Sequence, residues 1–132
     1  MTHAETDSFP SLGWFKRYAA FMEKDFDFTK HGRWLSTSIA FRIDQETVVV
    51  DLDRGIVLDI REGYDEDAEF LISGTSEQWS YLFDKGWGFI RLYRAQVLTV
   101  RGDIVRLMQN LTAIFFVVEA MKRYELGIRA KA

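Results

Sequence analysis

The stretch from Gln96 to Arg123 places the strongest constraint on how this chain can fold. It opens with a β-rich run that ends at Arg101, passes through Gly102-Asp103, and continues as a long apolar segment. Glycine permits a sharp turn, and an aspartate directly after it can cap a helix by accepting an N–H of the first turn. The sequence therefore predicts a short strand, a tight turn and a long helix.

The predicted helix is apolar over more than one stripe. The residues at helical spacing on its main face are Ile104, Leu107, Met108, Leu111, Phe115, Val118 and Met121. Further apolar residues widen this face, namely Val105, Ala113, Ile114, Phe116 and Val117. A helix this apolar must be covered on several sides. It is either a central core helix or one that also covers a partner subunit or a small apolar ligand.

Length and composition limit the class of protein. With 132 residues, 48% of them hydrophobic and 15% aromatic, the chain is predicted to form one folded domain. We expect this domain to span residues 10–125, between a flexible tail at 1–9 and a C-terminal tail at 126–132. A net charge of −3 argues against nucleic-acid binding through charge. The chain has no cysteine, which excludes disulfides, thiolate metal sites and a cysteine nucleophile.

We expect neither a targeting segment nor a membrane-spanning segment in this chain. Residues 1–12 lack the basic and apolar pattern of a signal peptide. The longest apolar run, residues 113–118, is far shorter than the roughly 20 residues needed to cross a bilayer. We therefore expect a cytoplasmic protein without stable membrane insertion.

The remaining segments alternate between helical and strand patterns. Apolar residues at helical spacing predict a first helix over residues 10–24, and period-2 alternation predicts strands over 35–43, 48–52 and 56–60. A short strand over 69–73 precedes a helix that Thr75 and Gln78 begin with a capping box. The segment 89–93 fits a short helix or an extended chain. The expected class is α+β, with N-terminal, middle and long C-terminal helices on one face of a largely antiparallel sheet.

A hairpin between residues 48 and 60 is the most specific local prediction. Gly55 in the left-handed conformation would close a three-residue loop at residues 53–55. Such a loop aligns three apolar pairs on one face, so that pattern and register agree. The predicted pairs are Leu52 with Ile56, Val50 with Leu58, and Val48 with Ile60.

Groups that carry out catalysis are scarce. The two histidines, His3 and His31, lie in a tail and a turn, which leaves no metal site without help from carboxylates. The acidic residues at 51, 53 and 65–67 are interpreted as solvated groups at hairpin and loop ends. No nucleophile elbow or phosphate-binding loop is present in the sequence. We therefore assign no catalytic residue, metal ligand or cofactor.

Charge and aromatic residues are unevenly spread. Residues 44–69 hold ten acidic residues against two arginines, whereas Arg91 and Arg94 lie near the last strand. These arginines are either solvated or anchor an anionic head group. The aromatic and aliphatic residues of the C-terminal half either fill a core or line an apolar cavity. The candidate ligand-binding residues are Trp79, Leu82, Phe83, Trp87, Phe89, Leu111, Ile114, Phe115 and Val118.

The order of these elements resembles the sterol carrier protein 2 (SCP-2) family. The similar stretches are Ala68-Glu-Phe-Leu-Ile-Ser73, Trp79-x-x-Leu82 with Gly86, and Val97-Leu-Thr-Val100 followed by Gly102-Asp103 and an apolar helix. The resemblance covers about residues 10–123. It departs from the family at residues 94–96, where a Gly-Lys is usual, and in the aromatic loop 86–88. It implies a five-stranded sheet, an apolar tunnel between sheet and helices, and non-enzymatic binding of sterols, acyl chains or other lipids.

Three functions are compatible with the sequence. The first is a carrier for a lipid, sterol or other apolar small molecule. The second is an interaction module that forms a homodimer or docks a partner through Val105, Ala113, Phe116 and Val117 of the last helix. The third is an isomerase or cyclase of the nuclear transport factor 2-like type, which needs a buried acid or histidine. We rank the third last because the acidic residues lie in loops or at outward strand positions.

Overall fold

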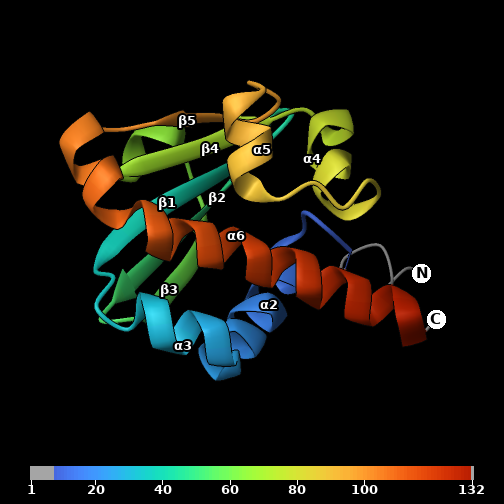
Figure 1. Cartoon of the computed structure of the whole chain (residues 1–132), viewed down its shortest axis with the longest axis horizontal. Coiled ribbons are helices and arrows are strands. Elements are labelled where there is room, and N and C mark those ends of the chain that lie inside the picture. Colours follow the sequence, from blue (N-terminus) through green and yellow to red (C-terminus); the bar gives the residue numbers. More distant parts are fainter. Residues whose placement is uncertain (1–7, 132) are drawn as a thin grey trace.

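The computed structural model describes residues 8–131, which form a sheet with helices on one side (Figure 1). Of the tail predicted at residues 1–9, residues 1–7 lie outside the described residues, whereas Phe9 packs against the core. The elements in chain order are α2 (Leu12–Lys24), α3 (Phe26–Gly32), β1 (Thr37–Ile43), β2 (Glu46–Asp53), β3 (Ile56–Glu62), the 3-10 turn η1 (Asp65–Asp67), β4 (Phe70–Gly74), α4 (Ser76–Phe83), α5 (Phe89–Arg94), β5 (Thr99–Arg101) and α6 (Ile104–Lys131).

The sheet has five strands in the order β3-β2-β1-β4-β5. Neighbours are antiparallel except β1 and β4, which run parallel because the chain crosses from one side of the sheet to the other after β3. The connection through η1 covers the face opposite the helices, where Ala40, Val49 and Leu71 are buried. The predicted fold class, a largely antiparallel sheet covered by helices on one face, is confirmed.

The predicted register of the β2–β3 hairpin is wrong. Arg54 and Gly55 both have positive φ, 48° and 77°, and close a two-residue turn, so that Asp53 pairs with Ile56. Two-residue turns of this kind match the twist of paired strands, which favours them over the longer loop. A bulge follows, and Leu58 is the extra residue between the Leu52–Val57 and Asp51–Asp59 pairs. Leu58 is consequently 66% exposed instead of facing the core.

The long helix and its turn form as predicted. The Asp103 carboxylate accepts the backbone N–H of Arg106 at 2.9 Å, as an N-cap should. Thr75 and Gln78 form the predicted reciprocal capping box at α4. Helix α6 then runs as one element to Lys131, and so includes residues 126–131 of the expected C-terminal tail. Its buried face consists of Leu107, Ala113, Ile114, Val117, Val118, Ala120 and Met121.

Two segments differ from the sequence prediction near the ends of helices. Helix α3 lies where the sequence analysis placed only a turn around His31, and the Asp25 side chain caps it by accepting the N–H of Phe28 at 3.0 Å. The strand expected from Gln96 begins only at Thr99. Gln96 has a φ of 59°, and the N–H of Val97 donates to the Leu92 carbonyl at 2.9 Å. The chain therefore remains folded against α5 before it joins the sheet.

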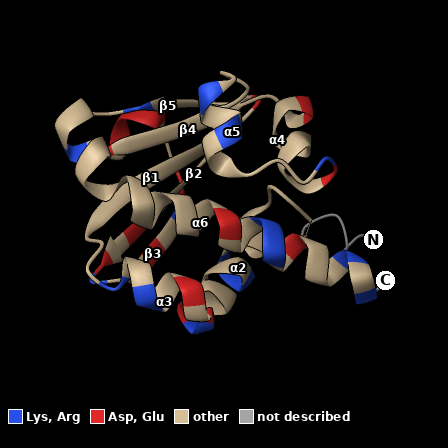
Figure 2. Ribbon diagram, in the orientation of Figure 1, with Lys and Arg blue, Asp and Glu red and all other residues tan. Residues whose placement is uncertain are grey.

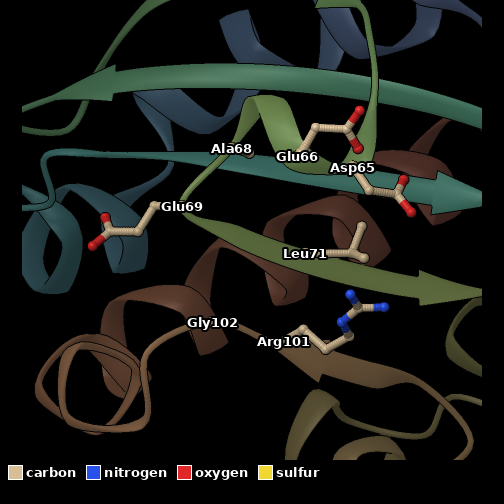
Figure 3. Close-up of a pocket in the computed structure, with 7 residues that line it drawn as sticks. All are labelled: Asp65, Glu66, Ala68, Glu69, Leu71, Arg101 and Gly102. Carbon is tan, nitrogen blue, oxygen red and sulfur yellow. The ribbon is translucent and has the colours of Figure 1, made fainter.

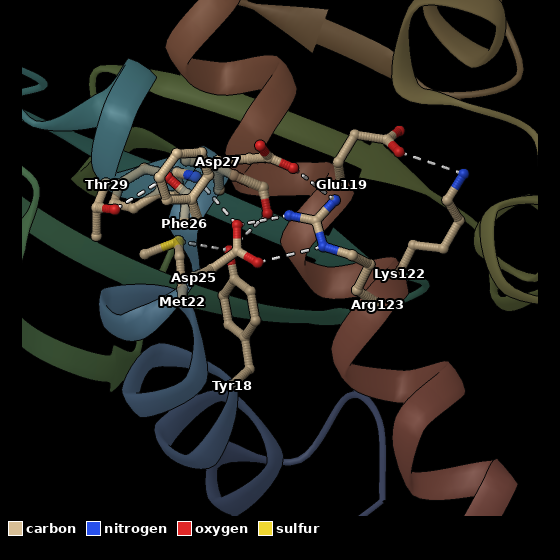
Figure 4. A network of polar contacts seen from close by, with 11 residues as sticks. Tyr18, Met22, Asp25, Phe26, Asp27, Thr29, Glu119, Lys122 and Arg123 are labelled. Carbon is tan, nitrogen blue, oxygen red and sulfur yellow. Dashed lines mark hydrogen bonds and ion pairs between the residues drawn. The ribbon is translucent and has the colours of Figure 1, made fainter.

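Polar contacts join α2 and α3 to α6 (Figure 4). The buried Tyr18 hydroxyl donates to the Val117 carbonyl at 2.7 Å. The Arg123 guanidinium donates to both oxygens of Asp25, from Nε at 3.2 Å and from Nη2 at 2.6 Å. A fork-like pair of this kind fixes orientation as well as distance. These contacts hold α6 in register over the N-terminal helices.

Replacing Tyr18 by phenylalanine is expected to change how stability depends on pH. Burial, followed by the charge of Asp25, raises the pKa of Tyr18 well above 10.0, although Arg123 lowers it. Above about pH 10 the unfolded chain loses this proton and the folded chain keeps it, so the free energy of unfolding falls as pH rises. At neutral pH we expect Tyr18→Phe to cost about 0.5–1.5 kcal/mol through the lost hydrogen bond.

Urea midpoints of both proteins across this pH range provide the measurement. The gap between wild type and Tyr18→Phe should narrow above about pH 10, because the variant lacks the titrating group. Other tyrosines and lysines affect the two proteins equally and cancel in the difference. A gap that stays constant up to the highest pH would contradict the buried, protonated state of Tyr18.

Candidate ligand groove between two helices

An apolar groove lies at the surface between α5 and α6. It has a volume of about 310 Å³ and is lined by Ile90 of α5 and by Leu111, Thr112, Phe115 and Phe116 of α6. Four of these five side chains are apolar, whereas four other hollows in the described part of the chain are lined by more polar groups. Apolar lining with few polar groups is typical of sites for small molecules.

The side chains of α5 explain how this helix lies against α6. In α5, Phe89 and Leu92 point into the core and are fully buried, which leaves Ile90 at the side that faces α6. The Phe89 N–H donates to the Glu119 carboxylate of α6 at 3.1 Å, and Lys122 lies 3.3 Å from the same carboxylate group. These polar contacts fix the start of α5 against α6 beside the groove.

The structure separates the predicted ligand-binding residues into two groups. Three remain partly exposed, and of these Leu111 and Phe115 line the groove, while Trp87 packs against Tyr81. Ile90 and Phe116 also line the groove, although the sequence had placed them in an ambiguous segment and on a partner surface. The predicted residues that are buried in the main core are Trp79, Leu82, Phe83, Phe89, Ile114 and Val118.

The two predicted anchor arginines take different positions. The Arg91 guanidinium lies over the Trp87 ring, 3.6 Å from its centroid. Arg94 borders a separate hollow of about 550 Å³ beside β5. Because residues four apart share one side of a helix, Arg94 begins one turn beyond Ile90 and the groove. Both side chains are exposed, and within residues 8–131 neither has a carboxylate within 4 Å.

Helix α3 also packs against α6. The His31 ring stacks on Phe116 with 4.3 Å between centroids and an interplanar angle of 7°. Ala113 and Val117, which the sequence had assigned to a partner surface, are buried. The exposed apolar side of α6 is therefore narrower than the sequence predicted and lies between α3 and α5.

A second hollow on the other face of the sheet is charged. Figure 3 shows Asp65 and Glu66 on one side of it and Arg101 on the other; its volume is about 340 Å³. Asp65 is already bound to Arg42 at 2.8 Å and to the Thr47 hydroxyl at 3.0 Å. These bonds hold η1 over the sheet. Among residues 8–131, no group of three or more histidines and carboxylates is placed to hold a metal ion.

Two further observations concern membranes and catalysis. Helix α6 is long and apolar enough to cross a membrane by length and composition, a test that core helices also pass, and 39% of its most apolar window is buried in the fold. In the described part of the chain no aspartate, glutamate or histidine is buried. An isomerase-like site would need such a group, so that alternative receives no support from the geometry.

Comparison with known proteins identifies the fold. No sequence profile of a known family and no curated protein matches the chain. A crystal structure of sterol carrier protein 2 superposes with a TM-score of 0.73 at 18% identity, over 83% of this chain and 94% of that one. A conserved hypothetical protein from Thermus thermophilus gives 0.70 at 17% identity, over 84% and 85%. Palmitated SCP2L2 from Aedes aegypti gives 0.55 at 16%, over 76% and 89%. The chain has an SCP-2-like fold.

Proposed function

We propose that this protein is a non-enzymatic carrier that binds a lipid or another apolar small molecule in the groove between α5 and α6. The observation that carries the proposal is the apolar lining of that groove by Ile90, Leu111, Phe115 and Phe116. The SCP-2-like fold supports it, because one protein of similar fold is described as palmitated. We propose a long acyl chain as the ligand class.

The size of the groove fits part of one acyl chain. Its volume of about 310 Å³ lies at the lower end of the range for small-molecule pockets. Each CH₂ moved out of water contributes about 0.8 kcal/mol, so eight of them would contribute about 6 kcal/mol, equivalent to a Kd of tens of micromolar. A longer chain would have to displace buried side chains such as Phe89 and Ile114, at a cost in packing.

An acidic head group would fit one side of the groove. Arg94 is exposed, has no carboxylate within 4 Å in the described residues, and stands one turn from Ile90. Arg91 is engaged with Trp87 and is the weaker candidate. We therefore propose Arg94 as the contact for a carboxylate at the end of the chain.

Binding of a fluorescent fatty acid, and its displacement by oleate, tests the proposal. We expect one molecule to bind per chain, and Phe115→Ala to weaken binding about 10- to 100-fold, because a buried phenyl ring is worth about 1.5–3 kcal/mol. Phe26→Ala is the matched control, since Phe26 is exposed and does not line the groove. Equal affinities in the two variants would exclude the groove as the site. Solvent extraction of the purified protein would then identify any natural ligand.

The alternative function, a module that forms a homodimer or docks a larger partner, rests on another observation. Ile104, Val105 and Met108 at the start of α6 remain exposed. Such a row could pair with a second copy or with another protein. Sedimentation at low micromolar concentration distinguishes this alternative, because a strict monomer would argue against self-association.

A further inference from the structure

The apolar groove continues along α6 as an exposed row. Ile104 and Val105 are each 60% exposed and Met108 is 49% exposed. Ile104 and Met108 are four residues apart, and Leu111 and Phe115 of the groove continue the same helical face. The row therefore runs from the groove to the first turn of the helix, where no described element covers it.

Basic residues lie on the two helices that stand on either side of α6 (Figure 2). Arg91 and Arg94 belong to α5 on one side, and Lys30 and Arg33 lie at the end of α3 on the other. All four side chains are exposed, and within residues 8–131 none has a carboxylate within 4 Å. Between Leu107 and Val118 the helix itself carries no charged residue.

The acidic residues near the row are already engaged, and most others lie elsewhere. Asp103 caps α6, and Glu69 binds Arg106 through two hydrogen bonds of 2.7 and 3.0 Å. The acidic stretch 44–69 belongs mainly to β2, β3 and η1. Although the whole chain carries a net charge of −3, the four basic residues on α3 and α5 keep their charge without a carboxylate within 4 Å in the described residues.

We propose that this face docks the protein on a bilayer that contains anionic phospholipid. We call it the docking face and define it by Ile104, Val105, Met108, Lys30, Arg33, Arg91 and Arg94. Apolar side chains with a basic rim are the combination that binds at the interface of an anionic membrane. The proposal extends the carrier function, because the groove would then open toward the membrane that supplies its ligand.

Charge favours a bilayer over a second copy of this chain. A symmetric dimer formed through the same face would bring its basic rims toward each other, and such like-charge contacts are unfavourable. An anionic surface satisfies both rims at once. Each basic residue near such a surface strengthens binding roughly fivefold, and added salt weakens this contribution.

Cosedimentation with vesicles tests the proposal. The vesicles consist of phosphatidylcholine alone or of phosphatidylcholine mixed with phosphatidylglycerol. We expect binding to the mixed vesicles only, and release by salt. Lys30→Gln/Arg33→Gln should weaken this binding at least tenfold, at roughly fivefold per basic residue. Ile104→Ser/Met108→Ser should also weaken it at least tenfold, because two apolar side chains no longer leave water, each worth about 1.5–3 kcal/mol. All these positions are exposed, and circular dichroism checks that each variant folds.

Matched controls remove the same chemistry at other places. Arg54→Gln/Lys131→Gln removes two exposed basic residues, and Ile56→Ser/Leu58→Ser removes two exposed apolar residues of β3. These variants should bind the mixed vesicles as the wild type does. Equal losses in control and docking-face variants, equal binding to both vesicle types, or a dimer that Ile104→Ser/Met108→Ser dissociates while vesicles remain unbound would each overturn the proposal.

Failure of docking can be separated from failure of the carrier function. Ile104→Ser/Met108→Ser changes no groove-lining residue, so its affinity for the fluorescent fatty acid should stay within about twofold of wild type, a difference of about 0.4 kcal/mol. Loss of fatty-acid binding only in Phe115→Ala, with unaltered vesicle binding, would locate the two activities on different residues. Vesicle binding without any fatty-acid binding would retain the docking face and reject the carrier function.

Discussion

Replacing Trp79 by alanine is expected to lower the free energy of unfolding by about 3–5 kcal/mol, because it leaves a large cavity in the core. Trp79 of α4 is fully buried. Its ring centroid lies 5.7 Å from that of Phe9 and 6.3 Å from that of Phe41. Its indole N–H donates to the Arg42 carbonyl at 3.0 Å, a bond that joins α4 to β1. Urea unfolding followed by circular dichroism measures the loss.

Trp34→Ala is the matched control for this substitution. Trp34 is 73% exposed, so its replacement should change stability by no more than about 0.5 kcal/mol. The sequence had placed Trp79 among the ligand-lining residues. A loss of less than about 1 kcal/mol in Trp79→Ala, together with altered fatty-acid affinity, would contradict its role in core packing and return it to the binding site.

Replacing Gly102 by alanine is expected to cost at least about 2 kcal/mol, from two sources that each contribute about 1–3 kcal/mol. The first is backbone strain, because Gly102 has a φ of 151°, a conformation that favours glycine. The second is overpacking. A Cβ at this position would lie 2.5 Å from Cδ1 of the buried Phe70 and 3.0 Å from the Glu69 carbonyl oxygen.

Gly127→Ala provides the opposite expectation at a second glycine. Gly127 lies within α6, and a Cβ there would meet no atom within 4 Å. Alanine is favoured over glycine inside a helix by about 0.8–1.0 kcal/mol, so this variant should be as stable as wild type or slightly more stable. Thermal unfolding of both variants provides the comparison. A Gly102→Ala protein as stable as Gly127→Ala would show that β4 relaxes to accept the new methyl group.

The hairpin shows why pattern and register can agree and still be wrong. Leu58 alternates with its neighbours in the sequence as an inward residue would. The two-residue turn at Arg54-Gly55 shifts the pairing by one residue, and the bulge at Leu58 shifts it by one more, so that Val50 pairs with Ile60. Turn geometry is decided by how the strands twist against each other, which a period-2 pattern does not encode.

The groove was only partly predictable for a related reason. Leu111 and Phe115 were identified because they are large and apolar at helical spacing. Other predicted ligand-binding residues, such as Trp79 and Val118, are buried in the core and do not line the groove. Ile90 joined the groove because α5 formed as a helix beside α6. Whether an apolar side chain fills a core or lines a groove depends on its neighbours in space.

The sequence by itself determined the local structure of this protein: the glycine turn and cap before α6, the capping box of α4, and the alternation that directs Ile39 and Phe41 into the core. These features depend on residues a few positions apart. Only the tertiary structure decided the parallel pairing of β1 with β4, the groove, and the basic rims beside it. Those features bring together residues from distant parts of the chain, and their energies depend on packing and charge in three dimensions.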